Sequence, residues 1–142
     1  MATKSYWPNR IAVKKIRSGN STKAIGNKAE KLAQKFIRSS GLKLIASNVR
    51  YSFGEIDLIA EDSDELVFIE VRFRSNSSHG LAAETVGSQK QRRLVSAAQA
   101  WLRDNQTYCN HYCRFDVIAI DSLIDTKHIS WQKNAFQVPG YD

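Results

Sequence analysis

The chain has 142 residues, of which 42% are hydrophobic and 25% are charged, the size and composition of one ordinary globular domain. It has no apolar run long enough to cross a membrane, and its basic N-terminus lacks the apolar stretch of a secretory signal, so we expect a cytoplasmic protein without a membrane partner. The net charge of +7 favours polyanionic partners, with nucleic acid ahead of an anionic surface.

The excess positive charge lies at the N-terminus, where residues 1–22 are predicted to form a basic, flexible arm. Residues 1–29 contain basic residues and no acidic one, whereas the rest of the chain has 14 of each. We expect Lys14, Lys15 and Arg17 to contact a nucleic-acid backbone. A solubilising tail would explain the same composition. A single domain is predicted over residues 23–138, followed by a short tail over 139–142.

The first predicted elements are a helix and a strand. Apolar residues at helical spacing predict a helix over residues 25–40, ended by Gly41. Glu30 flanks the buried stripe of this helix rather than pointing at water, although a surface glutamate with a buried stem is the alternative. Residues 42–51 predict the first strand.

Residues 54–74, GEIDLIAEDSDELVFIEVRFR, are the most informative segment because they predict two antiparallel strands and a turn. If the loop is the four residues 62–65, Glu61 pairs with Leu66 and Asp57 lies directly opposite Glu70. One face of this hairpin is apolar throughout. The other face, away from the turn, carries only charged side chains: Glu55, Asp57, Glu70, Arg72 and Arg74.

Two carboxylates opposite each other on neighbouring strands repel, and an apolar sheet penalises each unpaired charge. A cation is therefore expected between Asp57 and Glu70, and a hard divalent ion such as Mg²⁺ or Mn²⁺ suits such a pair. The alternative is an ordinary salt-bridge cluster in which Arg72 or Arg74 neutralises the two acids. A slip of one residue in the register would place the acids on opposite faces.

A second helix is predicted to follow a polar loop over residues 76–80. Its start fits a capping box, with Ser88 as the N-cap and Gln91 three residues later. Lys90 lies in the first turn, on the side that packs against the sheet. Together with Arg92 and Arg93 it makes a candidate phosphate cradle, and a solvated basic turn is the alternative.

The remaining elements complete a mixed sheet. Residues 114–120 predict a fourth strand and residues 128–132 a fifth strand at an edge. The order α-β-β-β-α-β-(β) is an α/β architecture with helices packed against the sheet. Cys109, His111 and Cys113 are three candidate zinc ligands without a second pair, so we favour free reduced thiols over a zinc site.

This order and five short motifs resemble the YraN-like family of bacterial proteins. The motifs are GNKAE at 26–30, GEIDLIA at 54–60, VFIEVRFR at 67–74, QKQRRL at 89–94 and RFDV at 114–117. The resemblance covers residues 26–136, most of the chain except the arm. It implies the restriction-endonuclease-like fold of the PD-(D/E)XK nucleases, with an αβββαβ core, and it is greatest to the Holliday-junction resolvase branch.

The resemblance also implies roles for individual residues. Asp57 takes the aspartate position of the nuclease signature and Glu70 the D/E position, and both would bind Mg²⁺ together with Glu30 from the first helix. Arg72 stands where the signature has lysine, although E-V-R also occurs within the YraN-like group. Arginine stays protonated and cannot act as a base, so Lys90 is the alternative occupant of that role.

The expected function is thus a Mg²⁺- or Mn²⁺-dependent endonuclease that acts on DNA rather than RNA, on branched or single-stranded substrates. Arg72 and Lys90 would stabilise the transition state, and Arg74, Arg92 and Arg93 would hold the DNA backbone without base specificity. Two alternatives stay open: a catalytically inactive nucleic-acid-binding module, and an interaction protein of a DNA-processing complex. Junction-cutting relatives often act as dimers, which makes a homodimer an option here.

Overall fold

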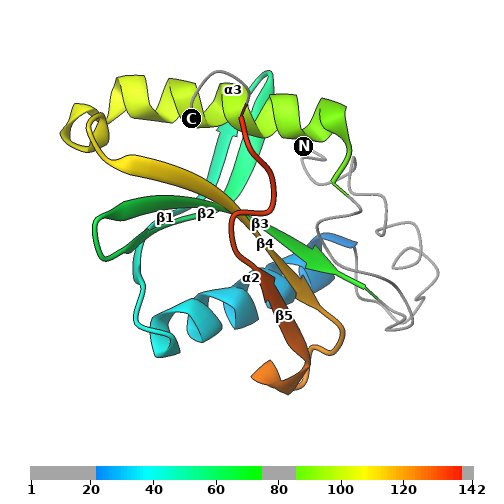
Figure 1. The fold of residues 1–142 in the computed structure, drawn as a ribbon. Coiled ribbons are helices and arrows are strands. Elements are labelled where there is room, and N and C mark those ends of the chain that lie inside the picture. The colour runs from blue at the N-terminus through cyan, green and yellow to red at the C-terminus, as the bar shows by residue number, and fades with distance from the viewer. Residues whose placement is uncertain (1–21, 75–85, 139–142) are drawn as a thin grey trace.

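A computed structural model of the chain describes residues 22–74 and 86–138. Over these residues the chain forms two α-helices and a five-stranded sheet, arranged as in Figure 1. The elements are α2 (Thr22–Ser39), β1 (Lys43–Tyr51), β2 (Gly54–Asp62), β3 (Glu65–Phe73), α3 (Ser88–Asp104), η2 (Gln106–Tyr108), β4 (Tyr112–Ile120), η3 (Thr126–His128) and β5 (Ile129–Gln132). The predicted α/β class and αβββαβ order are confirmed, and the predicted fifth strand forms at the sheet edge.

The sheet follows the order β1-β2-β3-β4-β5. Strands β3 and β4 are parallel, and every other neighbouring pair is antiparallel. A parallel pair needs a long crossover connection, which here contains α3. None of the helices in the described ranges is long and apolar enough to span a membrane.

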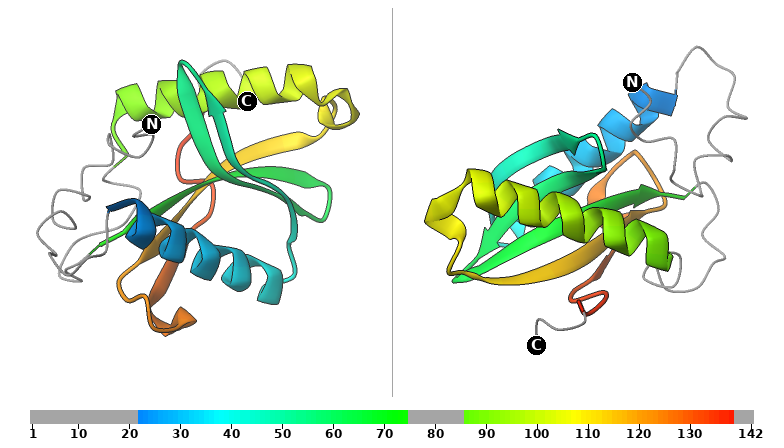
Figure 2. Two further views of the ribbon diagram at one scale, coloured as in Figure 1. Left: turned by 180° about the vertical axis from the view of Figure 1, so that it is seen from behind. Right: turned by 90° about the horizontal axis from the view of Figure 1, so that it is seen from above.

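The two helices cover opposite faces of the sheet (Figure 2). Because side chains alternate along a strand, each of the central strands supplies both cores. The α2 side buries Ile25, Ala29, Ala33 and Ile37 against Leu58, Val67, Ile69 and Val71. The α3 side buries Leu94, Ala97 and Trp101 against Ile59, Leu66, Phe68 and Phe115.

One predicted position on the apolar face is wrong. Ile56 was expected beside Leu58, but it packs in the α3-side core. The start of β2 runs across α3, and Gly54 lies so close to the backbone carbonyl of Arg93 that a Cβ atom would collide with it. Strand twist at the end of the hairpin therefore turns Ile56 toward α3.

The register of the β2–β3 hairpin agrees with the prediction. Glu61 lies opposite Leu66 and Leu58 opposite Ile69. The loop is shorter than predicted, because Asp62 still pairs with Glu65 and only residues 63–64 remain for the turn. The positive φ of 56° at Ser63 is typical of such two-residue turns.

Helix boundaries differ in detail from the predictions. α2 begins three residues earlier and ends one residue earlier than predicted, at Ser39, and the predicted stop residue Gly41 follows with a φ of +95°. The predicted capping box is wrong, because Gly87 is the N-cap of α3 and makes no side-chain cap. Gln91 instead donates its side-chain amide to the carbonyl of Val86 at 3.0 Å. The predicted arm covers residues 1–22, of which Thr22 is the first residue of α2. The rest of the arm, the loop over 76–80 and the tail over 139–142 lie outside the described residues.

Candidate functional site

Four charged side chains from three elements lie close enough to interact near the first turn of α3. Asp57 comes from β2, Glu70 and Arg72 come from β3, and Lys90 comes from the first turn of α3. Glu70 and Arg72 alternate with apolar residues and follow Phe68, which packs under α3. All four are buried, with exposed fractions of 1%, 1%, 0% and 8% respectively. We call these four residues the buried charge cluster.

Each acid of the cluster has a fixed partner. The ammonium Nζ of Lys90 lies 2.6 Å from Oε2 of Glu70. The backbone N–H of Val71 donates to Oδ2 of Asp57 at 2.9 Å, just beyond the last paired residues of the β2–β3 ladder. The carboxylate of Asp57 thus accepts the hydrogen bond that a backbone carbonyl would accept if the strand pairing continued. The nearest cation to Glu70 is therefore an amine from the helix, rather than a guanidinium alone as the salt-bridge alternative supposed.

Burial and charge shift the pKa values within the cluster in opposite directions. Burial, and then repulsion from Asp57, raise the pKa of Glu70 from 4.5 to about 8, although Lys90 and Arg72 act to lower it. Burial lowers the pKa of Lys90 and of Arg72, and attraction to Glu70 offsets part of this change. The two basic groups therefore do not fully compensate the cost of holding two buried carboxylates.

A divalent cation fits the donor chemistry of this cluster. Asp57 and Glu70 offer hard oxygen ligands on neighbouring strands, and their repulsion is what an added cation would relieve. Mg²⁺ keeps several water ligands and is usually bound through only one or two carboxylates. Over residues 22–74 and 86–138, however, no group of three or more His, Cys, Asp or Glu side chains is arranged to hold a metal ion.

Glu30 comes from α2, the helix that covers the other face of the sheet. Its side chain is 2% exposed and has an interaction partner inside the protein. It is not gathered with Asp57 and Glu70 into a three-acid metal group. Its part as an additional metal ligand stays a prediction.

The arginines predicted to hold DNA fall into two groups. Arg74 is buried, and its guanidinium contacts Asp121 through Nε at 3.1 Å and Nη2 at 3.4 Å. Its charge is therefore met by Asp121 inside the protein, and a DNA contact by Arg74 stays a prediction. Arg92 and Arg93 are exposed on the first turns of α3, as a polyanion contact requires. Lys14, Lys15 and Arg17 lie outside the described residues.

A second polar network, which the sequence analysis did not predict, holds β4 to its neighbours. Asp116 accepts from Arg114 Nε at 3.0 Å, from the indole of Trp131 at 2.9 Å and from the backbone of Asn134 at 2.9 Å. Arg114 also contacts Asp62 and Glu65 beside the β2–β3 turn. The sequence does contain a feature that could have predicted this network. Asp116 is an acid inside the otherwise apolar strand FDVIAI, and a buried acid must be paired.

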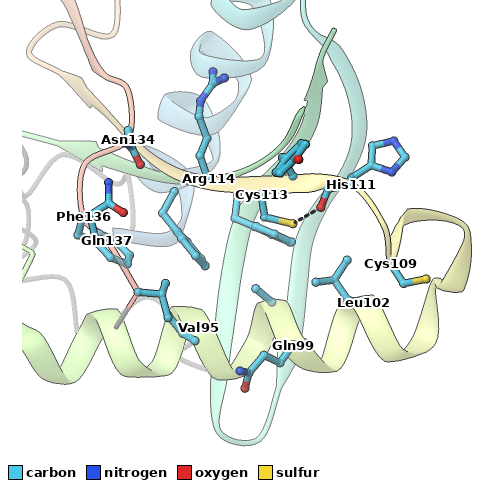
Figure 3. Close-up of a pocket in the computed structure, with 15 residues that line it drawn as sticks. Val95, Gln99, Leu102, Cys109, His111, Cys113, Arg114, Asn134, Phe136 and Gln137 are labelled. Atoms are coloured by element: carbon cyan, nitrogen blue, oxygen red, sulfur yellow. Dashed lines mark hydrogen bonds between the residues drawn. The ribbon is translucent and has the colours of Figure 1, made fainter. Parts of the chain in front are cut away.

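The cysteines lie near a separate cavity of about 380 Å³ between α3 and the start of β4 (Figure 3). No residue of the buried charge cluster lines this cavity. The Sγ of Cys113 lies 3.5 Å from the carbonyl oxygen of His111, whose imidazole turns toward Glu61 at 3.1 Å. Figure 3 shows that Cys109, His111 and Cys113 do not converge on one point, and both cysteines are free thiols.

Comparison with known proteins places this fold in a family. The family model described as uncharacterised protein family UPF0102 matches residues 29–120, a range that contains the whole buried charge cluster. A UPF0102 protein of Vibrio cholerae serotype O1 is 48% identical over 111 residues, which cover 78% of this chain and 89% of the relative. A UPF0102 protein of Francisella tularensis subsp. tularensis is 45% identical over 115 residues, which cover 80% of this chain and 95% of the relative. The predicted YraN-like relationship is confirmed, and the chain belongs to the uncharacterised protein family UPF0102.

Proposed function

We propose that the chain is a metal-dependent phosphodiesterase that cuts DNA internally, with the buried charge cluster as its centre. The observation that carries this proposal is the juxtaposition of two buried carboxylates on neighbouring strands, Asp57 and Glu70, whose repulsion helps to raise the pKa of Glu70 to about 8. These two residues would hold Mg²⁺ or Mn²⁺. When bound, the ion would act as a Lewis acid on a phosphate oxygen and lower the pKa of a water ligand.

The two basic residues of the cluster have different tasks in this proposal. Lys90 has a lowered pKa and a flexible stem, so its ammonium can leave Glu70 and donate to a phosphate oxygen of the substrate. Arg72 cannot accept a proton at neutral pH. Its guanidinium is fully buried beside Glu70 and acts to lower the pKa of that carboxyl, against the larger effect of burial.

The surface around the first turn of α3 supports a polyanionic substrate. Arg92 and Arg93 are exposed two and three residues after Lys90. A helix N-terminus also favours phosphate groups through its unpaired N–H groups and its dipole. Contacts of this kind hold the backbone without reading the bases, and the net charge of +7 adds attraction at long range.

A second candidate is a nucleic-acid-binding module without cleavage. Two observations favour this candidate. The ammonium of Lys90 already lies 2.6 Å from Glu70. Arg72 also stands at the position where the signature of the similar nucleases has lysine. With two acids and two bases, the cluster would then be a structural ion network. This candidate predicts salt-dependent affinity for DNA and no cleavage with any divalent ion.

The deciding experiment compares wild type with Asp57→Asn on branched, flapped and single-stranded DNA in Mg²⁺ or Mn²⁺. Asparagine keeps an oxygen acceptor for the N–H of Val71, so the fold should survive while the metal ligand is weakened. Asp64→Asn, which neutralises an exposed acid in the β2–β3 turn, is the matched control. Cleavage by wild type and the control, with a loss on the order of 100-fold or more in Asp57→Asn, supports the enzyme. Equal cleavage by all three preparations would indicate a contaminant, and binding without any cleavage would favour the second candidate.

A further inference from the structure

The tip of the β1–β2 hairpin carries a stacked pair of aromatic rings. The centroids of Tyr51 and Phe53 are 5.4 Å apart and their planes are inclined by 14°. Phe53 is 44% exposed and is one of only three large apolar side chains exposed among the residues that the structure describes. Tyr51 thus supports one face of Phe53, while Phe53 keeps solvent-exposed surface.

Two contacts with α3 fix the orientation of these rings. The phenol of Tyr51 donates to Oδ2 of Asp104 at 3.1 Å, near the C-terminal end of the helix. Gly54, which pairs with Tyr51 in the ladder, packs directly on the backbone carbonyl of Arg93 near the other end. The hairpin tip is therefore held along α3, and little conformational entropy would be lost when a flat ligand stacks on Phe53.

The charge around the tip suits a phosphate backbone. Arg50 is exposed directly before Tyr51, and Arg92 and Arg93 are exposed on the helix against which the tip packs. Of the two acids near the tip, Asp104 accepts from the phenol of Tyr51, and Glu55, opposite Arg50 in the ladder, is buried. Aromatic rings that stand among basic side chains are typical of surfaces that bind unpaired nucleotides.

The tip also lies within reach of the buried charge cluster. Strand β2 leads from Gly54 to Asp57 in three residues, or about 10 Å at 3.3 Å per residue. Along α3, Arg93 follows Lys90 by three residues, or about 4.5 Å at 1.5 Å per residue. A few nucleotides of one strand would therefore connect a base on Phe53 with a phosphate at the cluster.

We infer that Phe53, supported by Tyr51, is a stacking site for an unpaired nucleobase close to the cluster. The substrate class is then DNA with single-stranded bases, such as a flap, a gap or a branch, rather than intact duplex. Bases inside a duplex are already stacked on both sides and cannot offer a free face to the ring. Stacking does not depend on base identity, so the site selects strand structure and not sequence. The inference rests on the proposed function for what happens to the bound strand.

Binding without a divalent ion tests this site separately from cleavage. In EDTA, the affinity of wild type for labelled single-stranded DNA and for a blunt duplex of equal length would be compared with that of Phe53→Ala and Phe53→Trp. Phe53→Ala should weaken single-strand binding about tenfold and duplex binding less than about twofold. Phe53→Trp should retain wild-type affinity because the ring is kept.

A matched control is Tyr112→Ala, because Tyr112 is an aromatic residue 82% exposed beside Glu65, at the end of the hairpin sheet remote from Gly54. It should leave both affinities unchanged. Quenching of 2-aminopurine placed in the single strand should fall in Phe53→Ala and stay in Phe53→Trp. Thermal melting of each variant checks that the fold is intact.

The outcomes separate the site from the enzyme. If Phe53→Ala, still folded, binds single-stranded DNA within about twofold of wild type, the stacking site is wrong whether or not the protein cuts DNA. If Tyr112→Ala weakens binding as much as Phe53→Ala, the effect is general apolar contact and the inference is also wrong. If binding depends on Phe53 while wild type cuts no DNA in Mg²⁺ or Mn²⁺, the stacking site stands and the endonuclease proposal fails.

Discussion

Replacing Glu70 by glutamine should change how the stability of the protein depends on pH. The folded-state pKa of Glu70 is raised by burial and by Asp57, from 4.5 to about 8. Between these values the folded protein binds a proton that the unfolded chain has released. The contribution of Glu70 to stability is therefore fully present below about pH 4.5 and is lost as the pH rises through about 8. Glutamine has no such proton, so the variant does not lose this contribution.

The size of the effect follows from the shift. Each pKa unit corresponds to about 1.36 kcal/mol, so a change from 4.5 to about 8 sets an upper value of roughly 5 kcal/mol. Relaxation of the buried pair reduces it, and we expect about 2–5 kcal/mol. Lys90 changes the pH dependence of stability in the same direction, because removing the charge of Glu70 lowers the pKa of Lys90 further. The free energy of unfolding of Glu70→Gln should therefore rise relative to wild type between pH 5 and pH 9.

Urea titrations at several pH values from 5 to 9 would measure this difference, with Asp64→Asn as the control that neutralises an exposed acid of the turn. The control should run parallel to wild type. Curves of Glu70→Gln and wild type that also stay parallel within about 0.5 kcal/mol would refute the reasoning, because Glu70 would then titrate normally in the folded protein.

Three further predictions concern other parts of the chain. Gly54→Ala should destabilise the protein by about 1–3 kcal/mol, since the new Cβ meets the backbone of α3. Gly87→Ala has open space around it and changes only the N-cap of α3, so it should cost less, about 0.5–1 kcal/mol. Asp116→Asn should lower the free energy of unfolding by about 2–4 kcal/mol because it weakens a buried network with Arg114. The control Asp125→Asn, at an exposed turn, should lower it by less than about 1 kcal/mol. Equal losses for the two variants in chemical denaturation would show that the network is unimportant. Deletion of residues 1–21, which carry five basic and no acidic residues, should weaken DNA binding and reduce its dependence on salt concentration. Fluorescence anisotropy would measure the affinity at several salt concentrations. An unchanged dependence on salt would show that the arm is only a solubility tail.

The sequence predicted the hairpin well because its signals are local. Alternation of apolar and polar residues gave the faces of most β2 and β3 positions, and the predicted register holds from Leu58 opposite Ile69 to the turn. Asp57 and Glu70 lie just beyond these paired residues and still interact. The loop was predicted two residues too long because a pattern of polar residues does not define where strand pairing stops. Ile56 was assigned to the wrong core because the bend of the hairpin over α3 depends on a contact between residues far apart in sequence, Gly54 and Arg93.

Partners of charged side chains were harder to predict than strands. The sequence placed Lys90 on the sheet side of α3, but its pairing with Glu70 depends on how the helix crosses the sheet. Arg74 was expected to face DNA, whereas the end of β4 brings Asp121 against it. Spacing along a strand gives the face on which a side chain lies, and tertiary packing alone decides which opposite charge meets it.

The most direct test of the account is anomalous diffraction from crystals soaked in Mn²⁺ at alkaline pH, where Glu70 is ionised. The account predicts one manganese peak within bonding distance of carboxylate oxygens of both Asp57 and Glu70, with the ammonium of Lys90 moved away from Oε2 of Glu70. No peak at saturating Mn²⁺, with Lys90 still bound to Glu70, would contradict it, because the cluster would then be a closed ion network.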